Sequence, residues 1–121
     1  MVLSLSSRKC EPGVTVIELS GHLTLGQESG RIEAAVRAAL TEGAQKVVFD
    51  LSQVSYVDSS GIGVIAYCFG KISRTGGRAA AAGASGMVMD VFRLTRLDSV
   101  IPNFPDVPSA CEALAVMAPS A

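Results

Sequence analysis

Hydrophobic and polar positions along the first third of the chain predict two strands followed by a helix. The segments 2–7 ("VLSLSS") and 13–21 ("GVTVIELSG") are short, bounded by turn residues and linked through the turn-like "CEPG". From 26 to 42 the spacing becomes helical, and Gly43 is a suitable stop for that helix. One face of the predicted helix carries its apolar residues: Ile32, Ala35, Val36, Ala39 and Leu40.

The rest of the chain continues to alternate between strand and helix. Residues 46–52 ("KVVFDLS") are almost continuously apolar, as in a strand covered on both faces, and 53–58 are predicted to be a connection. Three more helices are predicted. The first carries an apolar stripe that begins at Ile62 and ends near 74–77, the second follows Ser85, and the third covers residues 108–117. Residues 78–84 and 99–101 are predicted to be short strands.

This order, β-β-α-β-α-β-α-β-α, predicts an α/β fold with a mixed, mostly parallel sheet and helices packed on it. A chain of 121 residues is expected to form a single domain over 1–121, with a core of about 5–117. Hydrophobic residues make up 49% of the chain and charged residues 17%, which excludes a disordered, solvated chain.

Charge and the length of apolar runs narrow the function classes. The 10 basic and 11 acidic residues are scattered, so no basic run marks a nucleic-acid site. The first residues lack the apolar centre of a signal peptide, and the longest apolar runs, about ten residues, are too short to span a bilayer. We expect a cytoplasmic protein that binds neither nucleic acid nor membrane.

The three cysteines, Cys10, Cys68 and Cys111, lie far apart in the sequence. An odd count without a C-x-x-C pair argues against a disulfide framework and against a zinc site. Cys68 falls on an apolar helix face and is predicted to be a small core residue. We therefore expect neither a disulfide nor a bound metal.

The segment 56–63 ("YVDSSGIG") places two serines where a buried strand gives way to a helix. In the first interpretation the D-S-S-G segment only caps the helix, since a side-chain oxygen of Ser or Asp satisfies a free amide there; one arrangement has Ser59 as the cap with Ser60 at the first helical position. In the second, Ser59 is a nucleophile with the chain's one histidine, His22, as its base, although no third orienting group is evident. In the third, a serine accepts a phosphate, which the positive end of the helix tolerates. Helix physics alone does not choose between Ser59 and Ser60.

The stretch "VVFDLSQVSYVDSSGIGVI" closely resembles the signature of the STAS domain, as found in bacterial anti-sigma factor antagonists. The earlier "VIELSGHLTLGQESGRIEAAV" resembles the second strand and first helix of that family, and the resemblance covers roughly Leu5 to Leu114. It implies a protein that is not an enzyme. In its unphosphorylated form it would bind an anti-sigma factor that is itself a serine kinase, and so free a sigma factor.

The resemblance also implies which residues carry this switch. The kinase, using ATP, would phosphorylate Ser59, and a PP2C-type phosphatase would reset it; no cofactor or metal is implied for the chain itself. The expected docking edge contains Leu23, Thr24, Asp58, Ser59, Ser60, Gly61 and Ile62. A monomer or weak dimer is expected.

One position departs from the family pattern. Many antagonists carry an acidic residue where this chain has the neutral Thr24, which bears on the identity of the partner. The same fold also serves as a scaffold, or as a subunit beside a lipid transporter, without a phosphorylation switch. That alternative, and the hydrolase using Ser59 and His22, stay open at this point.

Overall fold

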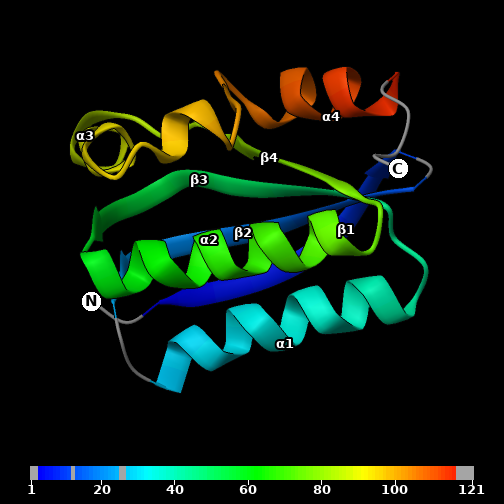
Figure 1. The fold of residues 1–121 in the computed structure, drawn as a ribbon, viewed down its shortest axis with the longest axis horizontal. Helices are drawn as coiled ribbons and strands as arrows, with labels where there is room; N and C mark the ends of the chain where they lie inside the picture. Colours follow the sequence, from blue (N-terminus) through cyan, green and yellow to red (C-terminus); the bar gives the residue numbers. More distant parts are fainter. Residues whose placement is uncertain (1–2, 12, 25–26, 117–121) are drawn as a thin grey trace.

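A mixed β-sheet runs through the centre of the molecule (Figure 1). The computed structural model describes residues 3–11, 13–24 and 27–116. Within these ranges the strands are β1 (Ser4–Glu11), β2 (Val14–Leu23), β3 (Lys46–Val57), β4 (Arg78–Ala82) and β5 (Asn103–Phe104), in that spatial order. β1 is antiparallel to β2, whereas the other neighbours pair in parallel. The predicted mixed, mostly parallel sheet is confirmed.

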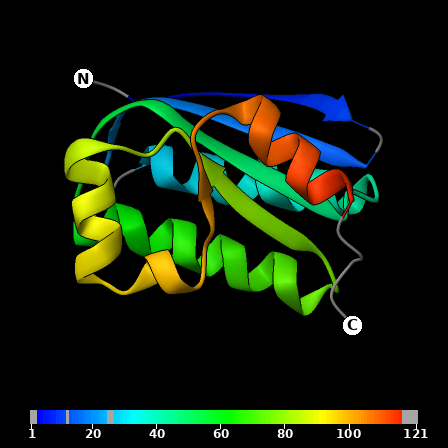
Figure 2. The ribbon, with the colours of Figure 1, turned by 90° about the horizontal axis from the view of Figure 1, so that it is seen from above.

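Helices cover both faces of this sheet (Figures 1 and 2). They are α1 (Gln27–Thr41), α2 (Ser59–Arg74), α3 (Gly86–Leu94), the 3-10 turn η1 (Leu97–Ser99) and α4 (Val107–Ala115). The crossovers β2–α1–β3 and β3–α2–β4 advance in the same direction across the sheet, so right-handed connections place α1 and α2 on the same face. α4 follows β5 and lies on the opposite face.

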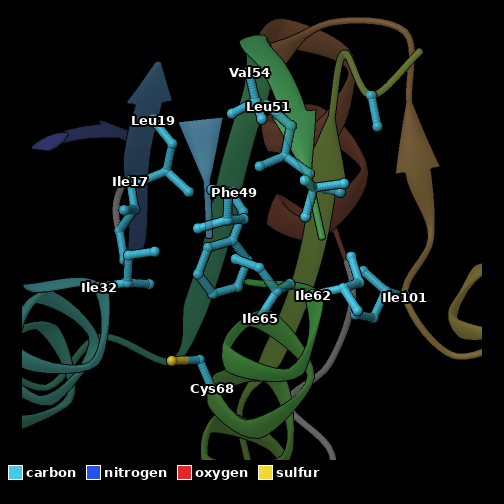
Figure 3. Close-up of a cluster of buried hydrophobic side chains, with 14 of the residues drawn as sticks. Ile17, Leu19, Ile32, Phe49, Leu51, Val54, Ile62, Ile65, Cys68 and Ile101 are labelled. Atoms are coloured by element: carbon cyan, nitrogen blue, oxygen red, sulfur yellow. The ribbon is translucent and has the colours of Figure 1, made fainter. Parts of the chain in front are cut away.

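Two clusters of buried apolar side chains follow from this layering. The larger cluster lies between the sheet and α1, α2 and α3, and Figure 3 shows Phe49 and Ile65 at its centre. The smaller one joins α4 to the other face through Val14, Val16, Val48, Ala80, Ala82, Ala110, Cys111 and Leu114. The alanines of β4 supply small side chains to both clusters, which lets helices approach this strand closely.

The prediction that residues 53–58 form a connection is wrong, because β3 continues to Val57. Its last residues pair with the end of β2, with Gln53 opposite Ser20 and Val57 opposite Leu23. Register shifts in this ladder break the two-residue alternation, so the buried positions become Leu51, Val54 and Val57. Because buried residues recur here at every third position, the alternation expected of a strand is absent from the sequence.

The predicted strand at 99–101 is also wrong. Ser99 ends η1, and the amide of Ile101 donates to the carbonyl oxygen of Leu97 at 2.7 Å, which closes a turn. Ile101 is apolar because it is buried in the larger cluster, and not because it pairs in the sheet. The last strand is Asn103–Phe104, beside Ala81 and Ala82.

The expectation that the cysteines form no disulfide is contradicted by a disulfide between Cys10 and Cys111. β1 runs past the predicted segment 2–7 and carries Cys10 close to its end, while α4 returns across the sheet and brings Cys111 beside it. The odd count leaves Cys68 free and buried, as predicted for a core residue. Val2, Gly26 and Met117, which were predicted to lie in regular elements, fall outside the described residues.

Candidate functional site

The ends of β2 and β3 lie side by side and lead directly into the start of α2. Leu23 pairs with Val57, and the amide of Asp58 donates to the carbonyl oxygen of Leu23 at 3.3 Å. Carboxyl ends of parallel strands meet at one edge of a sheet, which is where α/β proteins commonly place functional groups. The D-S-S-G segment therefore sits at this edge.

Asp58, and not a serine, is the N-cap of α2. Its backbone is extended, with φ −107° and ψ 179°, and its side-chain oxygen Oδ1 accepts a hydrogen bond from the amide of Gly61 at 2.8 Å. Its carbonyl oxygen accepts the amide of Ile62 at 2.9 Å, which starts the helical ladder. The interpretation in which Ser59 is the cap is wrong, because aspartate caps equally well and comes one residue earlier.

This arrangement leaves both serine side chains exposed on the first turn of α2. Within the part of the chain that the structure describes, no hydrogen bond is recorded for either hydroxyl. The two hydroxyls lie at the positive end of a helix of 16 residues. Neither serine side chain takes part in a hydrogen bond within the described residues, and both are exposed to solvent.

Gly61 is fixed by a close backbone approach. A Cβ built at this position would overlap the carbonyl oxygen of Leu23 and lie 2.6 Å from its carbonyl carbon. Two contacts thus hold the start of α2 against the end of β2: the hydrogen bond from the Asp58 amide and the close approach of the Gly61 Cα to Leu23. These contacts fix the position of Ser59 and Ser60, which lie between Asp58 and Gly61.

The remaining residues of the expected docking edge divide by burial. Thr24 and Asp58 are half-buried, whereas Leu23, Gly61 and Ile62 are buried inside the domain. Ile62 belongs to the larger apolar cluster (Figure 3), so its side chain faces the core. That these three residues take part in docking stays a prediction; in this conformation Ser59 and Ser60 supply the exposed side chains.

Sequence inspection missed Tyr56, an exposed aromatic residue beside this edge. The residue is 41% exposed, and its ring lies 5.4 Å, centroid to centroid, from the ring of His22 on the neighbouring strand. Leu23 and Val57, the next residues along, point into the core, so His22 and Tyr56 point to the opposite face. Leu51, Val54 and Val57 are apolar at every third position, and this spacing is the sequence signal that places Tyr56 on the outward side of the strand.

His22 and the serines of the D-S-S-G segment make no contact with one another that the described ranges show. The ring of His22 stacks obliquely on Tyr56, and among the described residues no hydrogen bond joins it to Ser59. No group of three or more potential ligands drawn from His, Cys, Asp and Glu occurs in the described ranges. No helix in those ranges is long and apolar enough to cross a membrane.

Comparison with known proteins identifies the fold. An anti-sigma factor antagonist from Mycobacterium paratuberculosis is 22% identical, with a TM-score of 0.80 over 94% of this chain and 95% of that one. The Bacillus cell fate determinant SpoIIAA in its phosphorylated form is 21% identical, with a TM-score of 0.73 over 91% of this chain and 98% of that one. A sulfate transporter family protein from Wolinella succinogenes is 13% identical, with a TM-score of 0.79 over 90% of each chain.

Sequence comparison gives the family directly. No curated protein matches the chain in sequence. The STAS domain family model, however, matches residues 7–110. Because that segment runs from within β1 into α4, and so includes the whole of β2 to β5, the chain belongs to the STAS domain family.

Proposed function

We propose that this protein is an anti-sigma factor antagonist switched by phosphorylation of Ser59. The unphosphorylated form binds an anti-sigma factor that is also a serine kinase, and the bound partner releases its sigma factor. The single observation that carries the proposal is the cap of α2. Because Asp58 caps the helix, the hydroxyls of Ser59 and Ser60 are exposed and unused at its positive end.

A phosphate at this position suits the local electrostatics. The first amides of a helix have no partner within the helix, and together with the helix dipole they favour an anion. The cap itself survives, since the amide of Gly61 stays with the Asp58 carboxylate. Phosphorylation therefore alters the surface without unfolding α2.

The same phosphate would block docking by charge. It adds about −1.5 to −2 charges next to the half-buried Asp58 carboxylate. A partner that covers this edge must then remove water from two neighbouring anionic groups, which is costly unless it brings matching cations. The switch needs no rearrangement of the core, which is consistent with the close contact between Leu23 and Gly61.

The choice of Ser59 over Ser60 rests on the D-S-S-G resemblance, since both side chains are exposed. ATP would enter with the kinase, and a PP2C-type phosphatase would remove the phosphate, so the chain itself uses no cofactor. SpoIIAA, which shares the fold, is known in a phosphorylated form. Thr24 replaces the acidic residue common in antagonists, so the partner kinase is expected to lack a cation aimed at this position.

Mass spectrometry of the intact protein tests the assignment. The chain is incubated with Mg-ATP and an anti-sigma factor kinase from the same genome, and the modified peptide is mapped. We expect one added phosphate, which is lost in Ser59→Ala and kept in Ser60→Ala. The two variants are matched controls, since both serines are exposed on the same helical turn. Loss in Ser60→Ala alone would contradict the assignment.

A second candidate is a docking subunit beside a membrane transporter, without a phosphorylation switch. The observation in its favour is the sulfate transporter family protein from Wolinella succinogenes, which has a TM-score of 0.79 with this chain. This candidate predicts that the chain co-purifies with a membrane transporter and gains no phosphate from an active kinase.

A further inference from the structure

The Cys10–Cys111 disulfide joins the two ends of the fold. Cys10 lies in β1, the edge strand, and Cys111 lies in α4, the helix that covers the second face of the sheet. The two residues are 101 positions apart in the sequence. A cross-link over so long a loop removes much of the freedom of the unfolded chain.

Apart from the disulfide, α4 is held to the sheet by a small apolar interface. Its buried side chains are Ala110, Cys111 and Leu114, and the half-buried Val107 packs against the same cluster. By comparison, α2 buries Ile62, Ile65 and Ile72. The Nζ of Lys46 donates to the carbonyl oxygen of Ala115 at 3.1 Å, but this contact is exposed and contributes little. The covalent bond therefore adds to a small apolar interface in holding α4 on the sheet.

The disulfide is also open to small molecules. A cleft of about 570 Å³ separates β1 from α4, and both cysteines line it together with Arg8, Val107, Pro108 and Glu112. Cys10 is half-buried, not enclosed. Cys111 is buried, so a low-molecular-weight thiol would approach the disulfide from the side of Cys10.

We propose that the Cys10–Cys111 disulfide is a thiol-responsive clip, which fixes α4 on the sheet when oxidised and releases it when reduced. The thiolate of a small thiol attacks one cysteine sulfur, the S–S bond breaks, and the other cysteine leaves as a thiolate and takes up a proton. A second small thiol attacks the mixed disulfide and frees the first cysteine. The protein gains two electrons and two protons, and two small thiols become one small disulfide; the reverse reaction closes the clip.

The third cysteine stays out of this exchange. Cys68 lies on the buried face of α2 and belongs to the larger cluster (Figure 3). Burial raises the pKa of its thiol to about 11, with a smaller contribution from the charge of Glu33. Since the thiolate is the reactive form, Cys68 neither attacks the disulfide nor takes a place in it while the domain is folded.

The clip and the serine site lie at opposite ends of the strands. The residue after Cys10 pairs with Val14 at the start of β2, whereas Ser59 follows the end of β3. Release of α4 would uncover Val14, Val16 and Val48 on the second face and leave α2 in place. The proposal is thus independent of phosphorylation, and each can fail without the other.

Hydrogen exchange and alkylation of the native chain test the clip. The protein is equilibrated in buffers of varied ratio of reduced to oxidised glutathione, alkylated with N-ethylmaleimide, and mapped by mass. We expect Cys10 and Cys111 to become labelled together as the ratio rises, while Cys68 stays unlabelled until the protein is denatured. In the reduced state the amides of α4 should exchange at least about tenfold faster, with those of α2 unchanged.

Two variants check that the response of α4 comes from the Cys10–Cys111 bond. Cys111→Ser should show the fast exchange of α4 without any thiol, whereas Cys68→Ser should keep the response of the native protein. If Cys111→Ser does not fold, the reduced native chain supplies the same measurement. The proposal is overturned if Cys10 and Cys111 are labelled under fully oxidising conditions, or if α4 exchanges equally in both redox states.

Discussion

The carbonyl group of Leu23 occupies the space that a side chain on residue 61 would need. Gly61 is in a helix, where glycine is otherwise unfavourable, so its presence reflects this contact. The contact ties the start of α2 to the end of β2 and presents Ser59 and Ser60 on a rigid support. The position of the two serines therefore depends on the absence of a side chain at Gly61.

Gly61→Ala should destabilise the domain, because the new Cβ forces α2 away from Leu23. We expect the free energy of unfolding to fall by about 2–3 kcal/mol, measured by urea denaturation. Gly63→Ala, two residues along the same helix, is the control, since a Cβ there meets nothing within 4 Å. It should raise stability by about 0.5–1 kcal/mol. Equal stability of the two variants would contradict the close approach.

Substitutions at Asp58 and Ser59 should separate the cap from the switch. Asp58→Ala removes the acceptor of the Gly61 amide and should cost about 1 kcal/mol of stability. Ser59→Ala removes a hydroxyl for which the described residues offer no hydrogen bond, and should change stability by less than about 0.5 kcal/mol. A larger loss in Ser59→Ala than in Asp58→Ala, seen in the same denaturation assay, would show that the serine is the structural residue.

Tyr56 is expected to contribute to binding of the partner kinase. It is exposed beside the D-S-S-G edge, and exposed tyrosines often dominate protein interfaces. Tyr56→Ala should weaken binding about tenfold in a calorimetric titration. Tyr67→Ala is the matched control, because Tyr67 is 50% exposed and lies two turns into α2. An equal effect of both variants, or none of Tyr56→Ala, would remove Tyr56 from the docking surface.

Asp106, the N-cap of α4, gives a pH dependence with a defined sign. Hydrogen bonds from the side chain and the amide of Ser109 lower the pKa of its carboxyl group below the ordinary value of 3.8. A group whose pKa is lowered by folding contributes stability above its unfolded value and loses it as the pH falls through the folded value. NMR titration should therefore find the pKa of Asp106 below 3.8.

Asp106→Asn is the control for this titration, since asparagine also caps a helix but does not ionise. Between about pH 5 and pH 3 the native protein should lose more stability than the variant. Parallel losses in the two proteins would show that Asp106 titrates as it does in the unfolded chain.

The fold could be predicted where local periodicity matches the final structure. Two examples are the apolar stripe from Ile62 to Ile72 and the apolar run at 46–52. Each belongs to a single helix or strand, so the spacing of its apolar residues is enough to predict it. The end of β3 could not be recognised from alternation, because register shifts against β2 change its burial period from two to three. The strand predicted at 99–101 was wrong for a similar reason, since Ile101 is buried in a turn and not in a strand.

The sequence indicated the D-S-S-G segment as the candidate site, but not the geometry within that segment. Serine and aspartate both cap helices well, and only the observed backbone shows that Asp58 takes this role. The contact of Gly61 with Leu23 joins elements far apart in sequence. The Cys10–Cys111 bond likewise depends on how α4 crosses back to β1, which cysteine spacing does not encode.

Calorimetric titration of the partner kinase with the two forms of the protein tests the central claim most directly. One sample is unphosphorylated, and the other carries a phosphate mapped to Ser59. We predict tight binding of the unphosphorylated form and at least about a 100-fold loss of affinity on phosphorylation, as expected for a buried dianion beside Asp58. Equal affinity of the two forms would contradict the switch.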